Sequence, residues 1–209
     1  MVFKNRIDAG KKLSNLMGFL SNRKDLILAL PRGGVPLGIV IAQKYSLSFG
    51  LLLAKKITLP SDPEYAIGAI AEDGEPVFEK GLMKKPYASL VKKEISNLKK
   101  EEKKKRIIYG KFLKKYSLKN RNVTIVDDGI ATGLTMLAAV KAAKNQQAIH
   151  VKAAVPIIPY DTFQQLNKEV DQIYALKVVK NFFGGIGNYY ERFPQINDQQ
   201  VQEMLKDFS

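Results

Sequence analysis

Short apolar runs alternate with amphipathic stretches along most of this chain. The mostly apolar runs, which we predict to be strands, lie at 26–30, 49–54, 123–126 and 148–155, with shorter ones at 65–70 and 172–177. Stretches with helical spacing or rich in helix formers lie at 3–20, 37–44, 87–111, 134–144, 160–168 and 198–206. Apolar strands that alternate with helices are typical of a parallel sheet buried on both faces. We therefore predict an α/β fold in which a parallel β-sheet is flanked by helices.

The loop after the predicted strand 123–126 carries the most specific chemistry. It begins with Asp127 and Asp128 and runs through two glycines into the next helix. Glycine lets a backbone approach a ligand closely, so the loop amides can form an anion cradle at the positive end of that helix. The proposed cradle consists of Gly129, Ile130, Ala131, Thr132, Gly133, Leu134 and Thr135.

The two acids set a second requirement on the ligand. Asp127 and Asp128 cannot bind a phosphate directly, but they suit sugar hydroxyls, a magnesium ion or a developing positive charge. A phosphate cradle beside two acids fits a phosphorylated ribose. A βα turn with an aspartate helix cap and no ligand is the alternative.

The stretch from Asp127 to Met136 resembles the 5-phosphoribosyl-1-pyrophosphate (PRPP) signature of the type I phosphoribosyltransferases. It matches that signature in its two leading acids, its Thr-Gly turn and its closing threonine. The resemblance extends to a little-characterised bacterial family, some of whose members are fused to a hydrolase-like domain for which this chain has no room. The further matching stretches are Phe3-(x)2-Arg6-(x)-Asp8-Ala9-Gly10, Leu30–Pro36, Ala66–Ala69 and Tyr190-(x)2-Phe193.

A second loop repeats this logic after the predicted strand 26–30. It consists of Pro31, Arg32, Gly33 and Gly34, and the planar guanidinium of Arg32 can clamp an anion. The resemblance implies that this is the pyrophosphate loop; without it, the loop reads equally as a plain βα turn.

Two lysines follow the predicted strand 49–54. One of Lys55 and Lys56 is expected to point at the pyrophosphate, and the family pattern favours Lys56. Lys55 is then a solvated surface side chain.

The segment 57–80 is rich in proline, glycine and acids and is either a surface hairpin or a mobile lid. The resemblance implies a lid that excludes water from an activated ribosyl donor. In 6-oxopurine phosphoribosyltransferases an Asp precedes the Thr-Gly pair, where this chain has Ala131. We expect a lid carboxylate, Glu72 or Asp73, to handle the proton of the base instead.

The tail from residue 178 is aromatic and punctuated by glycines. Phe182, Phe183 and Tyr190 are candidates for stacking on a planar base, and a hydrophobic flap on the sheet edge is an equal alternative. We predict one domain, 1–209, with a core at about 24–177, a hood at about 1–22 and 178–209, and a lid at about 57–80.

Charge and composition narrow the function further. The net charge is +14, and the stretch from Lys84 to Lys119 carries 14 Lys and Arg against 3 Glu. A solvated helix face is favoured there over a nucleic-acid surface. With no cysteine, one histidine, His150, and no apolar leader or span, we expect a soluble cytoplasmic protein that does not bind membranes and uses no thiol chemistry.

The resemblance implies a Mg2+-dependent enzyme that transfers phosphoribosyl from PRPP to a nitrogenous base and releases pyrophosphate. Asp127 and Asp128 would hold the ribose hydroxyls, and the metal through them and water, while Arg32 and Lys56 stabilise the leaving group. The expected partners are PRPP, a base that the sequence does not name, and a second copy in a homodimer. The alternatives are a PRPP- or nucleotide-sensing regulator that binds RNA or DNA through the basic helix, and, more weakly, a hydrolase of phosphorylated ribose.

Overall fold

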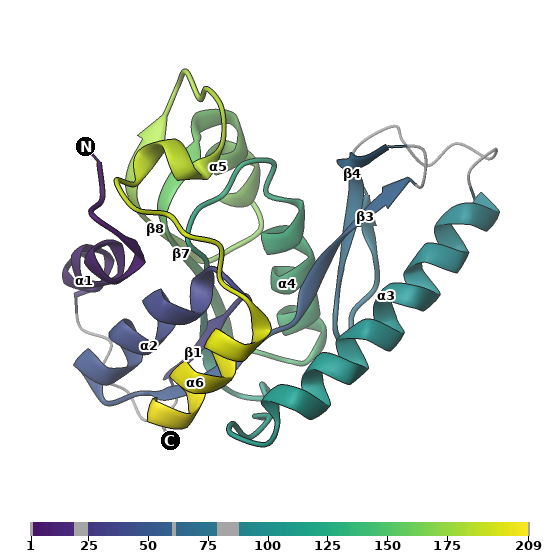
Figure 1. Ribbon diagram of the computed structural model, residues 1–209, viewed down its shortest axis with the longest axis horizontal. Helices are drawn as coiled ribbons and strands as arrows, with labels where there is room; N and C mark the ends of the chain where they lie inside the picture. The colour runs from purple at the N-terminus through teal and green to yellow at the C-terminus, as the bar shows by residue number, and fades with distance from the viewer. Residues whose placement is uncertain (1, 19–24, 60–61, 79–87, 209) are drawn as a thin grey trace.

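A five-stranded parallel sheet forms the centre of the molecule (Figure 1). The computed structural model describes residues 2–18, 25–59, 62–78 and 88–208. The strand order is β2-β1-β6-β7-β8, and all neighbouring strands are parallel. The strands are β1 (Asp25–Ala29), β2 (Ser48–Leu51), β6 (Asn122–Val126), β7 (His150–Pro159) and β8 (Gln172–Val179). The predicted α/β fold is confirmed.

Helices cover both faces of this sheet because its strands alternate their apolar side chains. In β1, Ile27 and Ala29 join the core under one set of helices, whereas Leu26 and Leu28 join the core under the other. The first set is α1 (Arg6–Leu16), α2 (Gly34–Tyr45) and α6 (Asp198–Phe208), and the second is α4 (Leu134–Asn145) and α5 (Tyr160–Leu166). Because all five strands are parallel, the βα loops that follow them leave the sheet at the same edge.

A second, antiparallel sheet stands beside the first and is sandwiched between two helices (Figure 1). It consists of β3 (Ala54–Leu59), β4 (Asp62–Ala71) and β5 (Val77–Phe78), with α3 (Ala88–Tyr109) on one face and α4 on the other. Two sequence predictions change here. The strand expected at 49–54 ends at Leu51, and the described part of the expected lid is a sheet with a packed core on each side. Residues 60–61 and 79–80 of that segment lie outside the described residues.

The start of the chain lies beside the tail at residues 189–191. The amide of Phe3 donates to the carbonyl of Tyr189 at 2.8 Å, and the amide of Glu191 donates back to the carbonyl of Phe3 at 2.8 Å. The tail contains a short 3₁₀ helix, η2 (Ile186–Tyr189), before it reaches α6. These contacts bring the start of α1 to the carboxyl edge of the sheet.

The helical spacing of apolar residues at 3–20 predicts that they share one buried face, and α1 fulfils this only in part. Ile7 and Leu16 are 43% and 48% exposed, whereas Leu13 is fully buried. Gly10 lies against α2 so closely that a Cβ there would be 3.1 Å from the Cα of Leu37. The buried face of α1 therefore runs through small residues and Arg6, because a close helix–helix contact leaves no room for larger side chains.

Candidate active site

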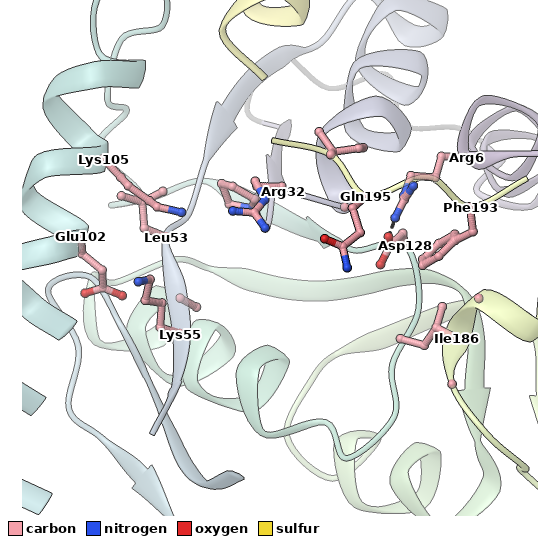
Figure 2. A pocket seen from close by; sticks show the side chains of 16 residues that line it. Arg6, Arg32, Leu53, Lys55, Glu102, Lys105, Asp128, Ile186, Phe193 and Gln195 are labelled. Carbon is pink, nitrogen blue, oxygen red and sulfur yellow. Dashed lines mark hydrogen bonds and ion pairs between the residues drawn. The ribbon is translucent and has the colours of Figure 1, made fainter. Parts of the chain in front are cut away.

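A cavity of about 530 Å³ opens at the carboxyl edge of the parallel sheet (Figure 2). Of the predicted site residues, Pro31, Arg32, Gly33 and Asp128 line it. The remaining walls come from the start of β3, from α3, from Arg6 at the start of α1 and from the tail. The pyrophosphate loop and the second acid of the signature thus face one space, where ligands bind in open α/β sheets.

Gly33 lets the two loops touch. A Cβ at this position would lie 2.1 Å from Oδ2 of Asp128, closer than any non-bonded contact permits. Gly34 is equally constrained, since its Cβ would lie 2.3 Å from the carbonyl oxygen of Val126. The two glycines are therefore needed to bring the pyrophosphate loop against the acid pair.

Arg6 holds Asp128 in place. Its Nε donates to Oδ2 of Asp128 at 2.7 Å, and both side chains are about nine-tenths buried. The same guanidinium donates through Nη1 to the carbonyl of Pro194 at 2.7 Å and lies 3.7 Å from the centre of the Phe193 ring. Sequence reasoning missed Arg6 as a site residue; its one signal was its place in the family-like stretch Phe3-(x)2-Arg6.

The acid pair has raised pKa values. Burial, and then the charge of Asp128, raise the pKa of Asp127 well above its usual range. Burial also raises the pKa of Asp128, and Arg6 opposes that rise. The amide of Asp128 donates to Oδ1 of Asp127 at 2.9 Å. Two buried carboxyls that share one cation gain from any further cation or hydroxyl donor that enters the cavity.

The predicted 5′-phosphate loop runs from Gly129 into the first turn of α4. Gly133 has φ +79° directly before α4, and a Cβ there would lie 2.6 Å from Cγ2 of Thr162. Among the described residues, the amides of residues 131–135 donate no hydrogen bond, as is usual at a helix start. Ile130 differs, because its amide donates to the carbonyl of Ile157 at 2.9 Å. The open amides are therefore those of 131–135, and none of these residues is on the cavity wall.

Lys55, and not Lys56, faces the cavity. Successive residues of a strand point to opposite sides, so only one of the two lysines can reach it. Lys55 lines the cavity and forms an ion pair with Glu101 of α3, whereas Lys56 is exposed and is not on the cavity wall. The structure therefore favours Lys55 over the expected Lys56, because the alternation of side chains along β3 turns Lys55 towards the cavity.

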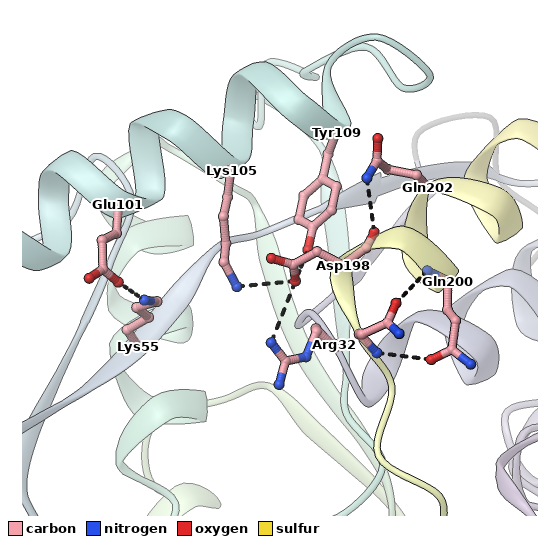
Figure 3. Close-up of polar contacts among 9 residues, drawn as sticks. Arg32, Lys55, Glu101, Lys105, Tyr109, Asp198, Gln200 and Gln202 are labelled. Carbon is pink, nitrogen blue, oxygen red and sulfur yellow. Dashed lines mark hydrogen bonds and ion pairs between the residues drawn. The ribbon is translucent and has the colours of Figure 1, made fainter.

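Arg32 belongs to a network that joins the sheet edge, α3 and α6 (Figure 3). Its Nη1 lies 3.5 Å from Oδ1 of Asp198, and Nζ of Lys105 lies 3.4 Å from the same oxygen. The hydroxyl of Tyr109 donates to it at 2.8 Å. Although burial opposes it, the Tyr109 hydroxyl and the two cations lower the pKa of Asp198, which stays ionised. Lys105, which sequence reasoning did not single out, is a cavity residue.

The expected lid carboxylates lie away from the cavity. Glu72 is buried in an ion pair with Arg106 and accepts a hydrogen bond from the amide of Leu53 at 3.2 Å. Asp73 is exposed and pairs with Lys115. Neither residue lines the cavity, because the end of β4 packs against α3 and does not extend over the carboxyl edge of the parallel sheet.

The three expected stacking residues are also placed elsewhere. Tyr190 is buried and donates through its hydroxyl to the carbonyl of Asp128 at 2.6 Å. Phe182 stacks on Tyr189 with ring centres 5.5 Å apart, and Phe183 is 78% exposed. The tail residues that line the cavity include Ile186 and Phe193.

Known proteins resemble this chain along its whole length. The sequence model of the phosphoribosyl transferase domain matches residues 5–190. Two proteins of Mycobacterium tuberculosis, both provisionally assigned as phosphoribosyl transferases, are 32% identical over 210 residues, or 98% of this chain and 46% of theirs. This chain thus spans about half the length of those curated relatives.

Solved structures share the fold of this chain. A crystal structure from Thermus thermophilus is 30% identical, is matched over the whole of both chains and has a TM-score of 0.82. A hypoxanthine phosphoribosyltransferase of Staphylococcus aureus shares the fold, with a TM-score of 0.50 at 11% identity over 87% of this chain and 79% of that one. The chain belongs to the phosphoribosyl transferase family.

Proposed function

We propose that this chain transfers phosphoribosyl from PRPP to a ring nitrogen of a nitrogenous base in the presence of Mg2+ and releases pyrophosphate. One observation carries the proposal: Arg32 and Asp128 face the same cavity, with Gly33 packed between their loops. A cation that could stabilise a leaving group and an acid that could bind a ribose support the proposal because they line one cavity.

The cavity is divided by charge in the way that this reaction needs. Arg32, Lys55 and Lys105 gather towards one end, and Ile186 and Phe193 lie at the other (Figure 2). The pyrophosphate would lie on the cations, and the ribose beside Asp128. When the bond between C1 of the ribose and the pyrophosphate oxygen breaks, negative charge grows at the cations and positive charge on the sugar ring. Fixed charges of the opposite sign stabilise both.

The 5′-phosphate would bind to the open amides at the start of α4. These amides, at 131–135, stand at the positive end of a 12-residue helix. A phosphate fixed there sets the position of C1, so that much of the rate would come from orientation.

The residues present fit a magnesium ion that is shared with the substrate. No group of three or more His, Cys, Asp or Glu side chains that could hold a metal occurs in the described ranges, and the acids beside the proposed ribose are Asp127 and Asp128. Magnesium is commonly held by one or two carboxylates together with substrate oxygens and water. When bound, it would supply positive charge to the phosphoryl oxygens. Asp127 and Asp128 would hold it through water and the ribose hydroxyls.

The acceptor base would lie at the apolar end of the cavity. That end includes the side chains of Ile186 and Phe193 (Figure 2). Ala131 offers no acid or base to a purine, and Glu72 is held by Arg106. Hypoxanthine and guanine should therefore be poor acceptors, and adenine or another nitrogen heterocycle a better one.

Pyrophosphate release from PRPP and Mg2+ with a panel of bases tests the proposal. Turnover with at least one base, abolished by Asp128→Asn, is the expected result. Efficient turnover of guanine or hypoxanthine would overturn the argument from Ala131 alone. Release without any base would instead identify a hydrolase of phosphorylated ribose.

A regulator that senses PRPP and binds nucleic acid is the second candidate function. One observation favours it: Lys92, Lys93, Lys99, Lys100, Lys103 and Lys104 are all exposed on α3. Salt-sensitive RNA binding without turnover would support this regulator over the enzyme.

A further inference from the structure

Glu102 is a buried carboxyl at the cationic end of the cavity. It lies on α3, lines the cavity and is 3% exposed (Figure 2). Its Oε1 is enclosed and, within the described part of the chain, has no hydrogen-bond partner. The neighbouring Glu101 is different, since it is exposed and pairs with Lys55. A buried carboxyl oxygen without a partner is costly, and a ligand that enters the cavity could supply one.

The surroundings of Glu102 keep it protonated. Burial, with the nearby Glu72 and Asp73, raises its pKa to about 8 against the opposing charges of Lys55 and Lys99. Lys105 of the same helix and Arg32 face the cavity too, but Asp198 lies between them and interacts with both. At neutral pH this side chain is therefore mostly a carboxylic acid, which can donate a hydrogen bond.

We propose that Glu102 is a catalytic acid that donates its proton to the departing pyrophosphate. This inference rests on the proposed function. An ionised carboxylate at this place would repel a polyanion, whereas a carboxylic acid binds one of its oxygens. The arriving pyrophosphate group adds negative charge and so raises the proton affinity of Glu102 further.

The step balances in the following way. The bond between C1 and the pyrophosphate oxygen breaks, and its electron pair stays on that oxygen. The proton of Glu102 moves to an oxygen of the pyrophosphate, which leaves Glu102 as a carboxylate. A lone pair of the base nitrogen forms the new bond to C1, and the proton of that nitrogen goes to solvent. Glu102 takes a proton from solvent after the product leaves.

The first test compares pH profiles of kcat for the wild type, Glu102→Gln and a matched control, Glu94→Gln, on the same helix. In the wild type kcat should fall at a pH above 8, because the bound pyrophosphate group raises the pKa of Glu102 beyond its value of about 8 in the free chain. Glu102→Gln should lose about a hundredfold in kcat and should lack this fall. Glu94→Gln should have the same pH profile of kcat as the wild type. Because titration of the substrate affects all three proteins alike, a difference seen only in Glu102→Gln comes from Glu102.

The second test needs no turnover. Calorimetric titration of pyrophosphate with Mg2+ at pH 8, in two buffers of different ionisation enthalpy, measures the protons taken up on binding. The wild type and Glu94→Gln should take up a larger fraction of a proton than Glu102→Gln. If pyrophosphate binds and the three proteins show equal uptake and equal pH profiles, Glu102 is not the acid. If the wild type neither binds pyrophosphate nor turns over PRPP, the proposed function falls and this inference with it.

Discussion

At the scale of single residues, the site depends on groups that are held by more than one neighbour. Asp128 is bound by Arg6 through its side chain and by Tyr190 through its carbonyl. Burial raises the pKa of Tyr190, so that its hydroxyl remains a donor. Because Arg6 lies near the start of the chain and Tyr190 lies in the tail, the position of the Asp128 carboxyl depends on both segments.

Replacing Arg6 with methionine tests this dependence. The change leaves Asp128 buried without its counter-ion, and loss of one partner of a buried pair typically costs about 3–5 kcal/mol. Urea unfolding should show a loss of that order. The double variant Arg6→Met/Asp128→Asn should recover part of it, since an amide needs no counter-ion. Equal stability of the wild type and Arg6→Met would show that the pair is not formed.

The stability of the protein should depend on pH through Glu102. The pKa of this group is raised from 4.5 to about 8 in the folded state. Between these values the folded chain retains a proton that the unfolded chain has lost, so stability falls as pH rises through this window. Thermal melts should show the advantage of Glu102→Gln over the wild type growing from pH 5 to pH 8 and then levelling off. Glu94→Gln should show no such trend.

The site residues that lie in the two βα loops can be predicted from the sequence, whereas the site residues that lie on α3 cannot. The loops carry Arg32, Gly33 and Asp128 within runs whose spacing is itself informative. Glu102 and Lys105 belong to a helix whose sequence predicts a solvated basic face. Packing of this helix against the second sheet turns these two side chains towards the cavity. No local pattern distinguishes them from the exposed charges beside them.

At the scale of elements, the residue at which β3 begins decides whether Lys55 or Lys56 faces the cavity. An apolar run from 49 to 54 reads as one strand, but the chain leaves the parallel sheet at Leu51 and starts a new strand at Ala54. This break depends on pairing with β4, which lies later in the chain. The sequence therefore predicts that one of the two lysines faces the cavity, but it does not predict which one.

The pair Lys55→Gln and Lys56→Gln tests the phase directly. Loss of Lys55 removes a cation from the cavity, and a hydrogen bond to a charged group contributes about 1.5–3 kcal/mol. Pyrophosphate affinity, measured by calorimetry, should fall about tenfold or more in Lys55→Gln. Lys56→Gln is the matched control for Lys55→Gln, because it removes the same charge from a residue outside the cavity. It should bind pyrophosphate as the wild type does. The reverse result would restore the family-based choice.

The exposed face of α3 gives a second test at this scale. Changing Lys99, Lys100, Lys103 and Lys104 to Gln removes four exposed charges that do not line the cavity. PRPP turnover should be unchanged within about twofold. Nucleic-acid affinity, if the wild type shows any, should fall and lose part of its salt dependence. A collapse of turnover would mean that the active site lies elsewhere.

At the scale of the whole molecule, the cavity joins parts that are distant in sequence. Its walls come from the start of α1, two βα loops, β3, α3 and the tail. No helix among the described residues is long and apolar enough to cross a membrane. A ligand that contacts all these walls should hold the hood, the parallel sheet and α3 together.

Ligand binding should therefore stabilise the folded chain in a way that depends on the acid pair. A ligand at about one hundred times its Kd stabilises the native state by about 2.7 kcal/mol. For a chain of 209 residues this corresponds to a rise in Tm of roughly 5–10 °C. PRPP with Mg2+ should give this rise, and PRPP with a chelator a smaller one, because the acids would hold the metal together with the substrate.

The double variant Asp127→Asn/Asp128→Asn separates binding from folding. Asparagine keeps the shape of both side chains but removes the charges that favour ribose hydroxyls and magnesium. The variant should remain folded, by circular dichroism, and should lose most of the rise in Tm with PRPP and Mg2+. The control Asp161→Asn/Asp207→Asn removes two exposed charges from α5 and α6, outside the cavity, and should keep the full rise. If the acid-pair variant keeps it as well, PRPP binds to this chain without Asp127 and Asp128, and the proposed place of the ribose is wrong.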